Sequence, residues 1–274
     1  MGTLRAFFII AVLTLVTPPL MLLQLALLAV RSRYATGLPV AYHRLVCALL
    51  GVRVTVHGAM AERRPLLLAV NHVSWLDISV LGSIAPLSFI AKSEVAGWPV
   101  FGWLAKLQRS VFVDRKRRTH TGKVNREIAD RLAAGDVMVL FAEGTSSDGN
   151  RVLPFRSALL GAVHEQAGDG TDPTINVQPV ALVYTRLCGL PMGFQHRPVV
   201  AWHGDVDLAP HLWRLLKSGT IDVTLAFAEP ISLAAAADRK KVAGAAEHAV
   251  RQRATILIAG RSLSEILPAP AETR

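Results

Sequence analysis

Cysteine is scarce in this sequence, and the two cysteines that it has do not form a recognisable site. Cys47 and Cys188 lie far apart among apolar neighbours, with no CxxC pair and no Cys/His ligand spacing. This pattern argues against a zinc site or a redox-active dithiol. It favours two buried thiols in a reducing compartment.

Aromatic residues are also few, and two common functional motifs are missing. Only 6% of the residues are aromatic and no nucleic-acid-binding motif is visible, so the net charge of +10 does not indicate a nucleic-acid partner. No G-x-S-x-G nucleophile elbow occurs, which argues against a serine hydrolase. Because the basic chain begins with a long apolar segment, we expect its counter-charge to be an anionic membrane surface.

Residues 6–30 form that apolar segment, broken only by two threonines and one glutamine. It is long enough to span a bilayer, too long for a signal-peptide core, and lacks a clean small-residue cleavage site. Pro18-Pro19 interrupts the helical hydrogen bonds, so either a kinked helix spans the membrane or two short helices dip into one leaflet. Arginines at both ends favour the dip, and a removed signal peptide is the third alternative. We expect residues 1–38 to anchor the chain, on the cytoplasmic face of a bacterial inner membrane.

Short apolar runs alternate with helical periodicity along the rest of the chain. The expected strands are 52–56, 66–70, 87–91, 110–113, 137–141, 175–184 and 220–228. The expected helices are 40–50, 75–84, 100–107, 119–134, 157–166 and 239–257, the first of them an amphipathic helix at the membrane interface. This alternation predicts an α/β fold with a largely parallel central sheet flanked by helices. We expect one domain over residues 39–267 and a loose tail at 268–274.

The segment from Asn71 to Asp77 follows the buried strand 66–70, at the sheet edge where α/β proteins collect ligands. Asp77 lies five residues after His72, in the first turn of the next helix. A carboxylate there can fix one tautomer of the imidazole, which leaves the other ring nitrogen to take a proton from an alcohol. The alternative is a capping box, because Ser74 to Asp77 also fits S-x-x-D. Taken alone, the segment is explained more simply by the capping box.

Polar residues follow two more of the expected strands. Glu143, Gly144, Thr145 and Ser146 come after strand 137–141, where backbone N–H groups, hydroxyls and a carboxylate could bind an anion or a polar group. On its own this stretch could equally be a surface turn.

Arg115 comes after strand 110–113 and is expected to face a substrate, whereas the following basic residues are expected to be solvated. Polar motifs at three strand ends together favour a catalytic site over capping and surface turns.

In order and spacing, Asn71-His72-x4-Asp77, Val-Phe-Val-Asp-Arg (111–115) and Glu-Gly-Thr (143–145) resemble motifs of the 1-acyl-sn-glycerol-3-phosphate acyltransferase family. Residues 177–182 resemble the family's fourth motif, so the resemblance covers residues 66–182. It implies a membrane-bound acyltransferase of EC 2.3.1 type that moves a fatty acyl group from acyl carrier protein or acyl-CoA to a lysolipid hydroxyl. It implies no metal or other cofactor.

The resemblance also implies a role for each motif. His72 is the expected base and Asp77 its orienting partner. Glu143, Gly144 and Thr145 are expected to position the acceptor, with Arg115 binding its headgroup.

Ser146 is a departure from the family pattern, because the lysophosphatidate enzymes usually have an arginine there that resembles a bidentate phosphate clamp. Losing such a charge-assisted contact costs roughly 1.5–3 kcal/mol, unless Arg151 or Arg156 compensates. The run 143–149, Glu-Gly-Thr-Ser-Ser-Asp-Gly, resembles the bacterial branch that acylates lyso-ornithine lipid, which has no phosphate. We therefore expect lyso-ornithine lipid as the acceptor. Lysophosphatidate is the first alternative and a non-catalytic membrane scaffold the second.

Overall fold

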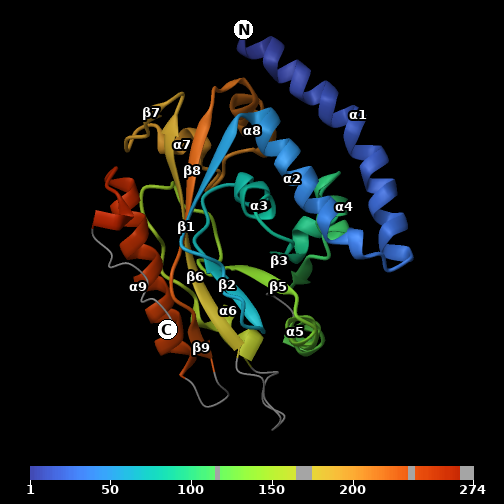
Figure 1. The fold of residues 1–274 in the computed structure, drawn as a ribbon, viewed down its shortest axis with the longest axis vertical. Helices are drawn as coiled ribbons and strands as arrows, with labels where there is room; N and C mark the ends of the chain where they lie inside the picture. Colours follow the sequence, from blue (N-terminus) through green and yellow to red (C-terminus); the bar gives the residue numbers. More distant parts are fainter. Residues whose placement is uncertain (115–117, 165–174, 234–237, 266–274) are drawn as a thin grey trace.

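A mostly parallel sheet at the centre of the molecule organises the chain (Figure 1). The computed structural model describes residues 1–114, 118–164, 175–233 and 238–265. Within them the strands are β1 (Val52–His57), β2 (Leu66–Val70), β3 (Leu87–Lys92), β4 (Val111–Val113), β5 (Val137–Phe141), β6 (Ile175–Leu187), β7 (Leu190–Pro191), β8 (Ile221–Phe227) and β9 (Ile231–Leu233). The main path runs β1-β8-β6-β2-β5-β3-β4, with β7 and β9 paired to β6. The predicted α/β fold is confirmed.

The register of the central strands places their carboxyl ends at one level. Strand β2 pairs in parallel with β5, Val70 opposite Phe141, and with β6, Val70 opposite Val180. Strand β3 continues the parallel order beside β5. Antiparallel pairing begins at β8, which runs against β6. The loops that follow β2 and β5 therefore leave the sheet side by side.

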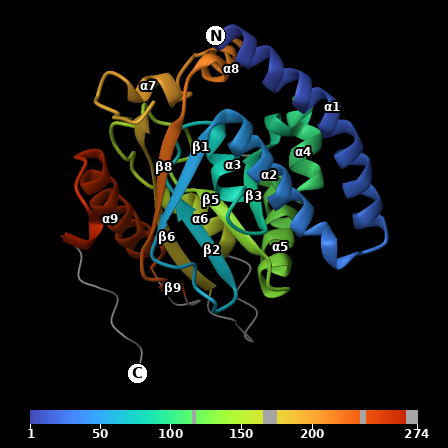
Figure 2. The same cartoon turned by 45° about the horizontal axis from the view of Figure 1, so that its top comes forward.

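Helices cover both faces of the sheet (Figure 2). They are α1 (Gly2–Ala29), α2 (Gly37–Leu50), α3 (Leu76–Gly82), α4 (Phe101–Leu107), α5 (Arg118–Ala133), α6 (Ser157–His164), α7 (Arg197–Val200), α8 (Leu208–Lys217) and α9 (Arg239–Ile258). Side chains of β2 alternate between the faces: Leu66, Leu68 and Val70 pack with α1, α2, α3 and α8. Leu67 and Ala69 pack with α5, α6 and α9.

Sequence periodicity did not predict α7, α8, β7 or β9. Helix α8 contains Pro210. The proline is the third residue of the helix, where its missing N–H would have no intrahelical partner anyway. Helix α8 buries His211, Leu215 and Leu216. A proline in a first turn is therefore no evidence against a helix.

Helix α1 is one continuous helix that runs along the domain (Figure 1). The prolines at 18 and 19 do not divide it, because contacts on both sides of them hold it in place. Thr17 shares a hydrogen bond of 3.0 Å with the Tyr42 hydroxyl, and Gln24 Nε2 donates to the carbonyls of Ala35 (2.8 Å) and Leu107 (3.1 Å). Among the described residues it is the one helix long and apolar enough to cross a membrane.

Helix α2 begins three residues earlier than expected and packs its apolar side against the core rather than lying only at an interface. Val46, Cys47 and Leu50 are buried in the cluster that covers β2. Arg44 lies on the opposite, exposed side and donates through Nε to the Ser83 carbonyl (2.8 Å). The amphipathic pattern was therefore predicted correctly, but its apolar face meets protein.

Arg5 ties α1 to the ends of two other helices. Its guanidinium donates to the carbonyls of Leu50 (2.7 Å) and Leu216 (2.6 Å), and also to that of Ser218. These carbonyls lie at helix C-termini, where a cation is favoured.

We expect Arg5→Met to lower the free energy of unfolding by about 1–3 kcal/mol, because it removes a charged donor from several helix-end carbonyls while keeping an apolar stem. Thermal unfolding in detergent measures the change. The matched control is Arg63→Met at an exposed loop arginine, and equal melting temperatures for the two variants would contradict the anchoring role.

Candidate active site

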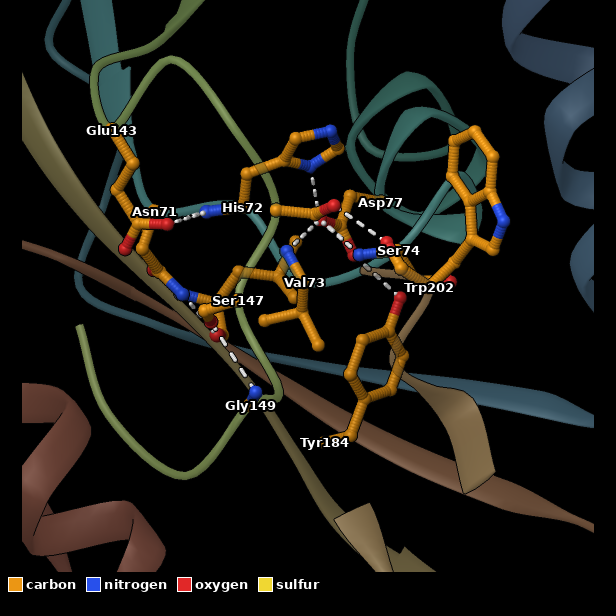
Figure 3. A network of polar contacts seen from close by, with 12 residues as sticks. Asn71, His72, Val73, Ser74, Asp77, Glu143, Ser147, Gly149, Tyr184 and Trp202 are labelled. Carbon is orange, nitrogen blue, oxygen red and sulfur yellow. Dashed lines mark hydrogen bonds and ion pairs between the residues drawn. The ribbon is translucent and has the colours of Figure 1, made fainter. Parts of the chain in front are cut away.

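His72 and Asp77 lie in contact in the loop between β2 and α3. His72 Nδ1 donates to Asp77 Oδ2 at 2.8 Å. The aspartate is fully buried, whereas the imidazole is 20% exposed. With Nδ1 engaged, the tautomer is fixed and Nε2 lies on the far side of the ring from Asp77 (Figure 3). The structure thus brings together the two residues that the sequence paired.

The Asp77 carboxylate accepts three further hydrogen bonds (Figure 3). Oδ2 also accepts from the backbone N–H groups of Val73 (2.7 Å) and Ser74 (3.0 Å). Oδ1 accepts from the Tyr184 hydroxyl at 2.7 Å. A buried carboxylate is costly unless its oxygens are hydrogen-bonded, and these donors meet that condition.

Asp77 can cap the helix and orient His72 at the same time. Asp77 accepts the return bond of a capping box, because the Ser74 N–H donates to its carboxylate. The other half of the box is missing, because Ser74 Oγ is buried without a hydrogen-bond partner among the described residues. One carboxylate therefore starts the helix and holds the imidazole.

The His72 ring packs against aromatic side chains. It stacks on Phe141, the last residue of β5, with ring centroids 4.0 Å apart and planes 19° apart. Phe141 in turn stacks on Phe89 of β3, at 6.2 Å. The imidazole is therefore held by packing below and by a hydrogen bond at its edge, and it has little freedom to rotate.

Glu143 lies beneath the loop that carries His72. The residue is 1% exposed, and its carboxyl oxygens accept from the backbone N–H groups of His72 (3.3 Å) and Leu153 (2.9 Å). Burial raises the pKa of this carboxyl to about 8, despite the two hydrogen bonds that lower it. Gly144 adopts φ +74° at the turn, and Thr145 is the exposed residue of this motif. Glu143 thus supports the His72 backbone.

Ser146 contacts a segment that the sequence did not associate with the site. Its Oγ donates to the Trp202 carbonyl at 2.5 Å, and the Trp202 N–H donates to the Val73 carbonyl at 2.9 Å. Tyr184 and Trp202 were both missed. Tyr184 lies in an expected strand, but only the pairing of β6 beside β2 shows that its hydroxyl reaches Asp77. Trp202 carries no sequence signal of its role.

The arginines near the motifs differ in exposure and in hydrogen bonding. Arg115 lies outside the described residues. Arg156 is exposed, and its Nε donates to the Glu143 carbonyl at 3.2 Å. Arg151 is exposed. Arg197 is 6% exposed and donates to the Asn150 side chain (3.2 Å) and the Ile258 carbonyl (2.9 Å).

Known proteins are similar to this one over most of the chain. A family model described as acyltransferase matches residues 53–183. The lyso-ornithine lipid O-acyltransferase of Brucella abortus is 47% identical, with 96% of this chain and 99% of the relative covered. That of Rhizobium meliloti is 44% identical, with 94% and 89% covered.

More distant relatives have names that refer to a phosphate-containing lipid. A 1-acyl-sn-glycerol-3-phosphate acyltransferase of Neisseria meningitidis is 31% identical, with 76% of this chain and 77% of the relative covered. The crystal structure of the 1-acyl-sn-glycerophosphate acyltransferase of Thermotoga maritima aligns with a TM-score of 0.67 at 21% identity, over 95% of this chain and 96% of that one. This last likeness shows a shared fold.

We expect stability to depend on pH through Glu143. Its folded pKa of about 8 lies above the ordinary 4.5, so between these values the folded chain retains a proton that the unfolded chain has released. The free energy of unfolding therefore falls as the pH rises through this window. Glu143→Gln does not titrate, so the wild type should lose melting temperature relative to this variant between about pH 5 and pH 8. Parallel melting curves across that range would show that Glu143 is not held protonated.

Proposed function

The chain belongs to the acyltransferase family that contains the lyso-ornithine lipid and 1-acyl-sn-glycerol-3-phosphate acyltransferases, and we propose that it acylates the hydroxyl of lyso-ornithine lipid. It is an acyl-transferring enzyme. The observation that carries the choice of acceptor is near-full-length similarity to relatives named for lyso-ornithine lipid. Ser146 supports it, because it stands where the family resemblance implies an arginine in the lysophosphatidate enzymes.

The geometry supports general-base catalysis by His72. Its Nε2 accepts the proton of the acceptor hydroxyl while the oxygen attacks the thioester carbonyl, and Asp77 stabilises the imidazolium that forms. The tetrahedral intermediate collapses with cleavage of the C–S bond, and the leaving sulfur takes the proton from His72. The products are the ester and the free thiol of coenzyme A or acyl carrier protein, with no acyl-enzyme intermediate.

The hydrogen bonds of the side chains around the Glu-Gly-Thr turn support an acceptor without phosphate. Ser146 directs its hydroxyl to Trp202, and Arg197 is directed at protein oxygens in a buried position. Arg156 donates to the Glu143 carbonyl. A phosphate dianion would require a charge-assisted clamp, for which Arg151 and Arg156 are exposed candidates among the described residues. The lysophosphatidate alternative rests on those residues and on relatives at about 30% identity.

The apolar helix and the lipid-metabolising relatives indicate membrane association. Helix α1 contacts the catalytic domain through Arg5 near its start and Gln24 near its end. A helix that crossed the bilayer could not keep both ends against one domain. This supports a helix lying in one leaflet, with Phe7, Phe8 and Leu15 exposed to lipid. We place the enzyme on the cytoplasmic face, where both candidate thioester donors occur.

The acceptor is tested with membranes containing the chain, a labelled acyl-carrier-protein or coenzyme A thioester, and the two lysolipids offered in parallel. We expect acylation of lyso-ornithine lipid to exceed that of lysophosphatidate. His72→Ala should lower turnover by about 10²–10⁴, the usual contribution of a general base. A preference for lysophosphatidate would overturn the acceptor assignment. Turnover retained in His72→Ala would overturn the role of the histidine.

Tyr184→Phe should lower kcat by about tenfold with little change in KM, because the Asp77 oxygen loses a hydrogen bond to a charged group. Thermal unfolding, measured beside the kinetics, separates this effect from a loss of folded enzyme. Tyr34→Phe, at an exposed tyrosine, is the control.

A further inference from the structure

Trp202 is fixed beside the catalytic loop by its own backbone. Its N–H donates to the carbonyl of Val73, the residue after His72, and its carbonyl accepts from Ser146 Oγ. The backbone of Trp202 is thereby hydrogen-bonded both to the loop that carries His72 and to the loop that carries Ser146. In Figure 3 the indole of Trp202 and the imidazole of His72 extend to the same side of the loop. The Trp202 indole therefore lies on the same side of the loop as the proposed base.

Trp202 forms an aromatic pair with Trp98, which lies between β3 and α4. The ring centroids are 5.7 Å apart and the planes meet at 80°, an edge-to-face arrangement. The indole N–H of Trp202 donates to the Val206 carbonyl at 2.6 Å, so its polar edge is already occupied. Both rings are half-buried, and neither belongs to the two hydrophobic cores. The pair thus offers partly open ring faces at the site rather than filling the interior.

The partly open ring faces of the pair suit a cation. Tryptophan has the aromatic face that attracts cations most strongly, and a nearby carboxylate adds to the attraction. Asp205 is exposed in the same turn as Val206, whose carbonyl accepts the indole N–H of Trp202.

We propose that Trp98 and Trp202 form the binding site for the primary ammonium group of the acceptor's headgroup, which rests on lyso-ornithine lipid as the acceptor. Ser146 is a positioning residue in this arrangement, because its hydroxyl holds the Trp202 carbonyl.

The test compares lyso-ornithine lipid with an analogue in which a methyl group replaces the side-chain ammonium, using the full chain in micelles of a non-ionic detergent. The wild type should show a KM for the acceptor with the ammonium about 2- to 30-fold below that for the methyl analogue. Trp202→Leu should abolish this ratio, and Trp202→Phe should retain part of it because an aromatic face remains. Trp103→Leu, at an exposed tryptophan of α4, is the matched control and should leave the ratio unchanged.

Three results separate the possibilities. If Trp202→Leu slows both acceptors equally, the residue only shapes the loops, and the ammonium site is overturned. If the wild type does not distinguish the two acceptors, the proposal is also overturned. If the wild type ignores both and acylates lysophosphatidate, the proposed function itself fails, and the headgroup site fails with it.

Discussion

The buried carboxylate of Asp77 is the interaction on which the rest of the site depends. It accepts from the His72 ring, from two backbone N–H groups of the same loop and from Tyr184 on β6. A desolvated carboxylate loses several kcal/mol when one of its donors is removed, so each donor must keep its place. One side chain therefore fixes the imidazole, begins α3 and ties the loop to the neighbouring strand.

The Glu-Gly-Thr loop secures the same histidine through its backbone. The His72 N–H donates to the buried Glu143 carboxyl, and the His72 carbonyl accepts from the Ser147 N–H at 2.8 Å. These contacts are possible because β2 and β5 are parallel neighbours in register, so the loops after them start at one level. The second motif thus acts mainly as a support for the first. That explains why a carboxyl with its pKa raised by burial lies beneath the His72 backbone.

Local patterns predicted the parts of the molecule that depend on local forces. Apolar runs such as Leu66–Val70 predicted the central strands. The spacing from His72 to Asp77 predicted their contact, because a short loop and one helical turn are enough to bring the two side chains together. Tyr184 and Trp202 could not be predicted, since their roles depend on strand register and on a long connection. The continuity of α1 through its prolines likewise depends on tertiary contacts that hold both halves.

Different bonds hold His72 and Trp202 in this structure. The bonds that hold His72 come from Asp77, Glu143 and Ser147, in buried or nearly buried positions. Ser146 binds the Trp202 carbonyl through its hydroxyl, and the Trp202 indole is half-buried. A substitution at Ser146 can therefore move the indole, which belongs to the proposed headgroup site, without removing any of the bonds that hold His72.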